Sequence, residues 1–274
     1  MTRHSAALTL MMITALLATG CTSENPATEE ETVRSATPSG SPSTDTSATP
    51  PTTSTPATAS PSSPATSAAS TPEAAASGAS GQQDPSSLTV VVNKQNPLNP
   101  PQWAPTDLTG LSVSTTKSGL QLRQPAADAA AALFAAAQAD GVSLSVVSAY
   151  RSYDYQVGTY QHWVNQQGAA AADRISARPG YSEHQTGLAM DVVGSDGACT
   201  LETCFQSTPA GRWVAEHAAE HGWVIRYPDG AESVTGYSYE PWHLRYLGTE
   251  AAQEIMDAGG VLETAWGLPA APGY

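Results

Sequence analysis

Positive charge is scarce in this 274-residue sequence, which has 11 lysines and arginines against 25 aspartates and glutamates. The imbalance persists in residues 88–274, where nine basic residues stand against 18 acidic ones. A surface of this sign repels phosphate backbones and anionic bilayers. We therefore expect no nucleic-acid partner, and any attachment to a membrane must come from something other than charge.

Cysteine is rare as well, because Cys21, Cys199 and Cys204 are the only three in the chain. A metal site made of thiolates would need further cysteines to complete its coordination. Cys199 and Cys204 are close in sequence, and in an oxidising compartment two nearby thiols most simply form a disulfide. We expect this disulfide, and closure of so small a loop contributes about 2 kcal/mol to stability.

The apolar stretch near the N-terminus, residues 6–17, is too short to span a bilayer. It follows the positive charge of Arg3 and is followed by the small residues 18–20, which is the pattern of an export signal. We interpret residues 1–21 as a lipoprotein-type signal peptide, with Cys21 lipidated as the new N-terminus. Ordinary signal cleavage ahead of Cys21, which would leave a secreted protein, is the alternative.

Aromatic side chains are missing from residues 22–87, which are almost entirely Ser, Thr, Pro, Ala and Gly with a few acids. Such a segment cannot bury enough apolar area to offset the entropy lost on ordering, so we expect a disordered tether. A flexible coil of this length spans about 40–50 Å. All six tryptophans and all ten tyrosines lie in residues 88–274, which we expect to form a single domain.

Segments with strand and helix character are mixed along this domain. Strands are predicted where Val-rich and Leu-rich segments are bounded by turn formers, at 88–92, 144–149, 188–193, 223–227 and 243–247. Helices are predicted at 126–140, 152–167, 209–221 and 249–258. Because the two kinds of element do not alternate regularly, we predict an α+β fold with a mainly antiparallel sheet and flanking helices.

Two histidines and an aspartate have the pattern of a metal site. His184 precedes a turn at Gly187, Asp191 lies on the predicted strand that follows, and His243 begins another predicted strand. Ligands at neighbouring strand ends can converge on one ion if the strands pair. Three nitrogen and oxygen ligands with an open fourth position make a catalytic zinc site, whereas a structural site is closed by a fourth protein ligand. We predict one zinc ion held by His184, Asp191 and His243.

Glu240 lies three residues before His243, within the run Glu240-Pro241-Trp242-His243. A carboxylate so close to a metal ligand is suited to take a proton from a metal-activated water and to return it to a leaving amine. The alternatives are a solvated loop acid or a hydrogen-bond partner of a ligand histidine. We expect Trp242 to pack beside the metal, and the combination indicates a hydrolase.

The sequence His217-Ala-Ala-Glu220-His221 also matches the pattern H-x-x-E-H of a known zinc-binding motif. On a helix its two histidines would share a face and could bind zinc. However, the predicted helix is alanine-rich, with Trp213 and Val214 on its buried face, and the first cluster already makes a complete site. We therefore expect this match to be a chance one on a solvated helix.

Three blocks of the sequence resemble those of the VanY-type D-alanyl-D-alanine carboxypeptidases. They are Ser148-Ala149-Tyr150-Arg151-Ser152, Ser182-x-His184-x-x-Gly187-x-Ala189-x-Asp191 and Glu240-Pro241-Trp242-His243. The blocks occur in the family's order, and the likeness covers the domain from about residue 88, including the predicted strand segment Val92-Asn93-Lys94 near its start. The resemblance implies the Hedgehog/D,D-peptidase fold and the same three zinc ligands.

The resemblance also implies roles for four further residues. Glu240 matches the catalytic glutamate, and Arg151 matches the arginine that faces the scissile carbonyl, where a guanidinium stabilises the developing oxyanion. The alternative for Arg151 is an ion pair that ties the start of a helix to the sheet. Ser182 and Gln156 match positions that hold the substrate's terminal D-alanine, although each could instead make a local cap or a turn hydrogen bond.

The activity that the resemblance implies is removal of the terminal D-alanine from peptidoglycan stem peptides by a metal-activated water. An L,D-carboxypeptidase or a peptidoglycan endopeptidase of the same fold is the alternative within this class. An inactive wall-binding or sensor lipoprotein is the alternative from another class. We expect a monomer that is anchored by lipid at Cys21 to the outer face of the bacterial cytoplasmic membrane and faces the cell wall.

Overall fold

The computed structural model describes residues 81–274. The predicted signal peptide, the lipidation site Cys21 and most of the predicted tether lie outside these residues. Packed structure begins before the predicted boundary at residue 88, because Arg123 Nη1 donates a hydrogen bond to Ser86 O at 2.8 Å. Within residues 81–274, no helix combines the length and the apolar character that crossing a membrane requires.

The described chain contains short strands, α-helices and single turns of 3-10 helix. The strands are β1 (Leu108–Gly110), β2 (Gln121–Arg123), β3 (Leu144–Ser148), β4 (Ala189–Gly194), β5 (Trp223–Tyr227) and β6 (Glu240–Tyr246). The α-helices are α1 (Gln124–Ala139), α2 (Tyr153–Gln167), α3 (Ala169–Ala172), α4 (Pro209–His217), α5 (Glu232–Thr235), α6 (Thr249–Asp257) and α7 (Leu262–Ala265). The 3-10 turns are η1 (Glu183–Thr186), η2 (Thr203–Ser207) and η3 (Ala218–His221).

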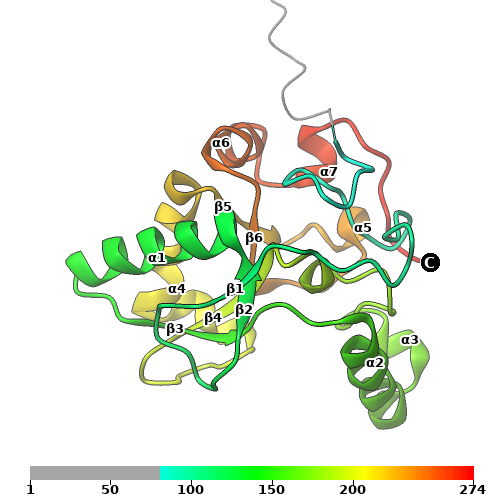
Figure 1. The fold of residues 1–274 in the computed structure, drawn as a ribbon, viewed down its shortest axis with the longest axis horizontal. Coiled ribbons are helices and arrows are strands. Elements are labelled where there is room, and N and C mark those ends of the chain that lie inside the picture. Colours follow the sequence, from blue (N-terminus) through cyan, green and yellow to red (C-terminus); the bar gives the residue numbers. More distant parts are fainter. Residues whose placement is uncertain (1–80) are drawn as a thin grey trace, which may run out of the picture. The chain divides into compact units, whose positions relative to one another are not determined.

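Every pair of neighbouring strands in the two sheets is antiparallel. The larger sheet has the order β3-β4-β6-β5, and β1 and β2 form a separate two-stranded sheet. Helices lie around the larger sheet, with α1 and α4 on one side and the pair α2 and α3 at a distance from them (Figure 1). The predicted α+β fold with an antiparallel sheet and flanking helices is confirmed.

The two faces of the larger sheet differ in chemistry. Successive strand residues point to opposite faces, so Met190 and Val192 of β4 share one face and Asp191 takes the other. Across the strand pair, Leu244 of β6 is opposite Met190, and His243 is opposite Asp191. The face with Met190 and Leu244 packs with α1 and α4 into the main hydrophobic cluster. The other face is therefore the one that carries the candidate metal ligands.

Most predicted elements are present close to their predicted bounds. α2 begins where expected because the Ser152 hydroxyl accepts a hydrogen bond from Tyr155 N at 3.2 Å, which caps the helix. α1 ends before Gly141, whose φ of +77° lies in the left-handed region that glycine adopts readily. The predicted helix 209–221 is only partly α-helical, since its last turn is the 3-10 turn η3.

The predicted strand at residues 88–92 is wrong. Val90 and Val92 are buried, but residues 88–89 form a turn, residues 90–92 are irregular, and the segment belongs to neither sheet. Its carbonyl groups are paired with a side chain instead, because Arg245 Nη2 donates to Leu88 O at 3.0 Å and to Val90 O at 2.7 Å. An apolar run of this length predicts burial, and only the tertiary fold decides which group satisfies its backbone.

Beneath the polar face of the sheet lies a fully buried cluster of charges. Glu183 Oε1 accepts hydrogen bonds from Arg226 Nε and from Arg245 Nη1, both at 2.9 Å. Arg226 Nη1 also donates to Glu263 Oε2 at 2.9 Å, which connects β5 to α7. Burial alone would raise the pKa of Glu183, but the two arginines outweigh this effect and hold the pKa well below its usual range.

Removal of one partner from this charge cluster should lower the stability of the fold strongly. We expect Arg245→Ala to lower the free energy of unfolding by about 3–5 kcal/mol, because it takes one cation from Glu183 and removes the Nη2 donor from the carbonyls of Leu88 and Val90. Urea denaturation provides the measurement. Arg174→Ala is the matched control, since its ion pair with Glu232 is exposed and should contribute less than about 1 kcal/mol. Equal effects of the two changes would contradict this account.

Candidate metal centre

Three side chains from three different elements meet at the polar face of the sheet. His184 lies on η1, Asp191 on β4 and His243 on β6, and all three are buried. One ligand atom from each lies within 4.8 Å of the others, and no other group of His, Cys, Asp or Glu in residues 81–274 is arranged in this way. The strands that carry Asp191 and His243 are paired, as the sequence argument required.

The turn between His184 and Asp191 depends on Gly187. This glycine ends η1 with a φ of +69°, a conformation that L side chains rarely adopt. A Cβ atom at this position would also lie 2.9 Å from Arg123 Cγ. Glycine is therefore required both by the backbone and by the space, and it lets the chain reverse from η1 into β4 within a few residues.

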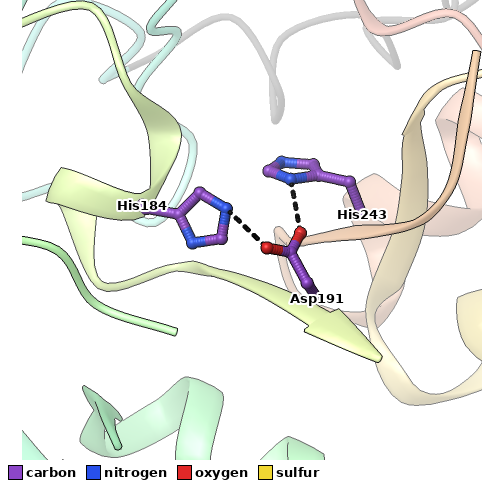
Figure 2. Close-up of side chains that lie close together, drawn as sticks. All are labelled: His184, Asp191 and His243. Atoms are coloured by element: carbon purple, nitrogen blue, oxygen red, sulfur yellow. Dashed lines mark hydrogen bonds and ion pairs between the residues drawn. The ribbon is translucent and has the colours of Figure 1, made fainter. Parts of the chain in front are cut away.

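The carboxylate of Asp191 lies between the two histidines, with one oxygen directed at each ring (Figure 2). Its Oδ1 is 3.1 Å from His243 Nδ1, and its Oδ2 is 3.4 Å from His184 Nε2. These two nitrogens and the carboxylate thus face a common point. An arrangement of two imidazoles and one carboxylate is a donor set that zinc and similar divalent ions accept.

The second nitrogen of each histidine is already engaged. His184 Nδ1 donates to Ala149 O at 2.8 Å, so Nε2 is left with the lone pair that a metal needs. His243 Nε2 lies 3.4 Å from Glu183 Oε2, so Nδ1 is the atom that faces the common point. Metal-ligating histidines usually donate their other N–H to a carbonyl or a carboxylate. The residues present therefore fit a bound divalent cation.

Burial and neighbouring charges act differently on the two imidazoles. Burial, together with the positive charge of Arg151, lowers the pKa of His184 to about 4, so its ring is neutral at pH 7. Burial also disfavours a charged His243, but hydrogen bonds with Asp191 and Glu183 outweigh it and raise the pKa to about 9. A metal that takes the Nδ1 lone pair of His243 must displace a proton from that ring.

Glu240 is the first residue of β6 and lies at the same centre. Its Oε2 is 3.9 Å from His243 Nδ1, the nitrogen that faces the common point, and its side chain is only 12% exposed. Glu240 is therefore not a solvated loop acid. Burial, followed by the like charge of Asp191, raises the pKa of Glu240 to about 8 against the opposing effect of His243. A carboxyl group that titrates near neutrality can both accept and return a proton.

Arg151 directly follows the loop after β3, and its backbone N donates to His184 O at 3.2 Å. Its side chain lines the same cavity as the three candidate ligands. The Nε atom is buried and has no hydrogen-bond partner among residues 81–274, and none of the ion pairs found there involves this arginine. The alternative of a structural ion pair is therefore not supported, and a donor is left for an anionic or carbonyl oxygen.

The other residues named from the sequence have different positions. Ser182 is buried in the wall of the cavity, and Trp242 lines it while packing against the main hydrophobic cluster. Gln156 is fully buried behind the wall, where its Nε2 donates to Ala177 O at 2.7 Å. Its Oε1 is buried and has no partner within residues 81–274. Gln156 thus holds the segment that lines the cavity.

One cavity of about 510 Å³ is lined by the three candidate ligands and by Glu240, Arg151, Ser182 and Trp242. Its reactive end is lined by Arg151, Ser182, Glu183, His184, Asp191, Tyr227, Glu240, Trp242 and His243. Cavities of this size are typical of sites for small molecules and short peptides. The metal ligands, a carboxyl group with a raised pKa and an unpaired guanidinium therefore share one solvent-accessible site.

Two residues of this site were not identified from the sequence. Glu183 hydrogen-bonds His243, and Tyr227 stacks on the His243 ring with centroids 4.9 Å apart. Glu183 is adjacent to a predicted ligand in the chain, but nothing in the sequence places its side chain next to a histidine 60 residues away. Tyr227 ends a predicted strand, and only the pairing of that strand with β6 brings it to the site.

Two other candidate metal-binding patterns in the sequence, the H-x-x-E-H match at 217–221 and the pair Cys199 and Cys204, do not form metal sites. His217 Nδ1 lies 3.2 Å from Glu220 Oε1 on the exposed side of the α4–η3 segment. Cys199 and Cys204 are joined in a disulfide, so neither offers a thiolate.

Comparisons with known proteins agree with this geometry. Residues 119–249 match the family model described as VanY, D-alanyl-D-alanine carboxypeptidase. A putative carboxypeptidase, YodJ of Bacillus subtilis (strain 168), is 42% identical over 66% of this chain and 67% of its own length. Among solved structures, the LdcB LD-carboxypeptidase has 41% sequence identity to this chain and a TM-score of 0.64, and the match covers 68% of this chain and 88% of that chain.

A vancomycin-resistance D,D-pentapeptidase VanY in complex with Zn(II) has 35% sequence identity and a TM-score of 0.55, and the match covers 66% of this chain and 98% of that chain.

The contact between Glu183 and His243 predicts a measurable effect on metal binding. We expect Glu183→Gln to weaken zinc binding by about 10- to 100-fold, because an amide is a poorer acceptor for the N–H of a ligand histidine. Zinc affinity is measured by competition with a chromogenic chelator. Glu263→Gln is the matched control, because Glu263 also pairs with Arg226 but is not among the partners of His243. An equal loss of affinity in both variants would show a general effect on stability.

The raised pKa of His243 predicts that metal binding depends on pH. The ring keeps its proton up to about pH 9, so binding at pH 7 should release about one proton from it. The apparent affinity should therefore rise with pH between 6 and 8, by up to about tenfold per unit. Calorimetry in two buffers of different ionisation enthalpy measures the released protons. An affinity that does not change over this range would contradict the assignment of His243.

Proposed function

This chain belongs to the VanY family of D-alanyl-D-alanine carboxypeptidases, and we propose that it is a zinc enzyme that removes the terminal D-alanine from peptidoglycan stem pentapeptides. The observation that carries the proposal is the convergence of His184, Asp191 and His243 beside Glu240 and Arg151 in one cavity. A peptidase is the class that the family supports, so the alternative of a silent wall-binding lipoprotein is set aside.

In this proposal the metal is zinc and is held by His184 Nε2, Asp191 and His243 Nδ1. Zinc supplies Lewis acidity, which lowers the pKa of a water and polarises a carbonyl oxygen. The protein's contribution is to keep both imidazoles in the correct tautomer. The carbonyl of Ala149 does this for His184, and the carboxylate of Glu183 does it for His243.

Glu240 is the proposed general base and acid. Its carboxylate takes a proton from the water that attacks the carbonyl of the penultimate residue, and then gives this proton to the departing amine of the terminal D-alanine. Its position supports this role, because it faces the metal-directed nitrogen of His243 from inside the cavity. Burial raises the pKa of Glu240, which suits a group that has to return the proton that it accepts.

Arg151 is the proposed stabiliser of the negative charge that develops on the carbonyl oxygen. The Arg151 side chain lines the cavity and forms no ion pair with residues 81–274, so its guanidinium can donate to that oxygen without first breaking such a pair. Ser182, in the cavity wall, is proposed to contact the terminal D-alanine directly. Gln156 is proposed to position the wall near the terminal D-alanine, because its Nε2 donates to Ala177 O in the segment that lines the cavity. Its Oε1 accepts no hydrogen bond from residues 81–274.

An L,D-carboxypeptidase acting on tetrapeptide stems is the second candidate. It is favoured by the identity of 41% to the LdcB LD-carboxypeptidase, compared with 35% to the D,D-pentapeptidase VanY. The zinc-site residues and Glu240 would serve both reactions equally, because each reaction cleaves the amide bond that precedes a terminal D-alanine, and the two substrates differ in the residue on the acyl side of that bond. Substrate assays therefore have to separate them.

We also propose that the enzyme works at the outer face of the cytoplasmic membrane as a lipid-anchored monomer. The support is the export pattern ahead of Cys21 and the composition of residues 22–87, which suits a tether. Such a tether would let the domain reach wall peptides at some distance from its anchor.

Incubation with defined stem peptides tests the proposal. We expect zinc-loaded enzyme to shorten a stem pentapeptide by one D-alanine, as measured by mass spectrometry, and to lose this activity when a chelator removes the metal. A tripeptide formed from the tetrapeptide, with no cleavage of the pentapeptide, would replace the D,D assignment by the L,D one. Release of a cross-linked partner peptide would identify an endopeptidase.

Glu240→Gln is the informative variant in the same assay. We expect kcat to fall by about 100- to 10,000-fold, because the amide cannot accept the proton of the attacking water. Zinc binding should be retained, because Glu240 is not among the three proposed ligands. A variant that binds zinc and still hydrolyses the peptide at the normal rate would remove Glu240 from the mechanism.

A further inference from the structure

The cavity is also lined by residues that are not among the reacting groups. They are Thr159 and Trp163 of α2, Ile175, and Leu201, Glu202 and Thr203 of the loop between β4 and α4, and we call this part of the lining the distal end. The loop is closed by the disulfide between Cys199 and Cys204. Two walls that are distant in sequence, α2 and the disulfide loop, thus border one space that is continuous with the catalytic end.

Exposed apolar side chains gather at this distal end. Trp163, Ile175 and Leu201 are 37%, 38% and 43% exposed, and they account for three of the six large hydrophobic side chains that are exposed in residues 81–274. Single exposed apolar residues are common, but a group of them around one cavity marks a binding surface. The exposed parts of these three side chains are available for contact with a ligand in the cavity.

The disulfide loop holds Leu201 in a backbone conformation that is costly for leucine. Cys199 and Leu201 have φ values of +58° and +55°, and no other non-glycine residue in residues 81–274 has a positive φ. Such conformations persist only where the surrounding structure imposes them. Here the disulfide closes the loop, and the fully buried Phe205 anchors its C-terminal side in the core. The fold thus maintains the presentation of Leu201 toward the cavity.

The opposite wall is held in place as well. Tyr160 OH donates to Asp173 Oδ1 at 2.8 Å, and Gln156 Nε2 donates to Ala177 O at 2.7 Å. These bonds fix α2 against the segment that carries Ile175. Because both walls are held by contacts outside the cavity, the space between them is preformed, and a ligand does not have to order it.

We propose that α2 and the loop closed by Cys199 and Cys204 form a subsite for the aliphatic part of the substrate peptide that lies upstream of the cleaved bond. The proposal rests on the proposed function. A cavity of about 510 Å³ is much larger than one terminal alanine, so it has room for more of the peptide. The part of the substrate on the acyl side of the scissile bond must extend away from the reacting groups. The distal end belongs to the same cavity and can receive it.

The subsite should affect affinity and leave the chemistry unchanged. The proposed ligands, Glu240 and Arg151 lie on η1, β4, β6 and the loop after β3, whereas Trp163 lies on α2 and Leu201 on the disulfide loop. Loss of apolar contact at the distal end therefore weakens binding only of peptides long enough to reach it. A short ligand that ends at the two terminal residues does not sense the change.

Binding measurements on a form that does not turn over the peptide test this inference. The zinc-loaded Glu240→Gln protein is titrated by calorimetry with a stem pentapeptide and with acetyl-D-Ala-D-Ala. We expect Trp163→Ala and Leu201→Ser each to raise the Kd for the pentapeptide about five- to tenfold and to leave the Kd for the short ligand unchanged. Replacement of both Cys199 and Cys204 by serine should have the same selective effect, because the loop then loses its closure.

Val157→Ala is the matched control, because Val157 is an exposed apolar residue of α2 that does not line the cavity. It should change neither Kd. An unchanged pentapeptide Kd in both wall variants, or equal weakening of the two ligands, would overturn the subsite. If the wild-type enzyme hydrolyses no stem peptide while the selective weakening is observed, the proposed function fails and the subsite stands. If hydrolysis occurs without selective weakening, only the subsite fails.

Discussion

The carboxylate of Glu183 is the interaction on which both the fold and the site depend. One of its oxygens receives hydrogen bonds from Arg226 and Arg245, and the other faces Nε2 of His243. A fully buried carboxylate is costly unless it is paired, and here two arginines offset that cost. The same group orients a candidate metal ligand. Stability of the core and orientation of the His243 ring are therefore coupled through one side chain.

Side chains alternate between the two faces of the antiparallel sheet, so one face packs the core and the other face carries the candidate metal ligands. Met190 and Leu244 pack under α1 and α4, and the residues next to them, Asp191 and His243, face the cavity. Asp191 and His243 thus each have an immediate neighbour in the chain that is fully buried in the core. This arrangement limits movement of the ligands, which a site with three protein donors and an open position requires. The 3-10 turn that carries His184 is held to the sheet by Gly187 and by the hydrogen bond from Arg151 N.

The cavity combines a polar reactive end with a distal end that carries the exposed apolar side chains of Trp163, Ile175 and Leu201, and the two are built by different parts of the chain. The reactive end uses the residues of the family's motifs. The distal end uses α2 and the disulfide loop, which lie outside those motifs. Chemistry and selection of the substrate can therefore change independently, because a substitution at Trp163 or Leu201 does not touch the proposed ligands. In the proposed subsite, these walls would set the preference for one peptide over another.

Sequence alone determined the α+β class, the approximate bounds of the four longest α-helices and four of the groups that meet at the centre. It could do so because periodicity, capping residues and motif spacing are local properties, as with Ser152 at α2 and Gly187 after His184. The tertiary structure alone decided the rest. It turned the apolar segment 88–92 into a coil whose carbonyls pair with Arg245, and it placed Glu183 beside His243. Contacts of this kind join residues up to about 160 positions apart, and they arise only when strands and helices pack, because neither partner carries a local signal of the other.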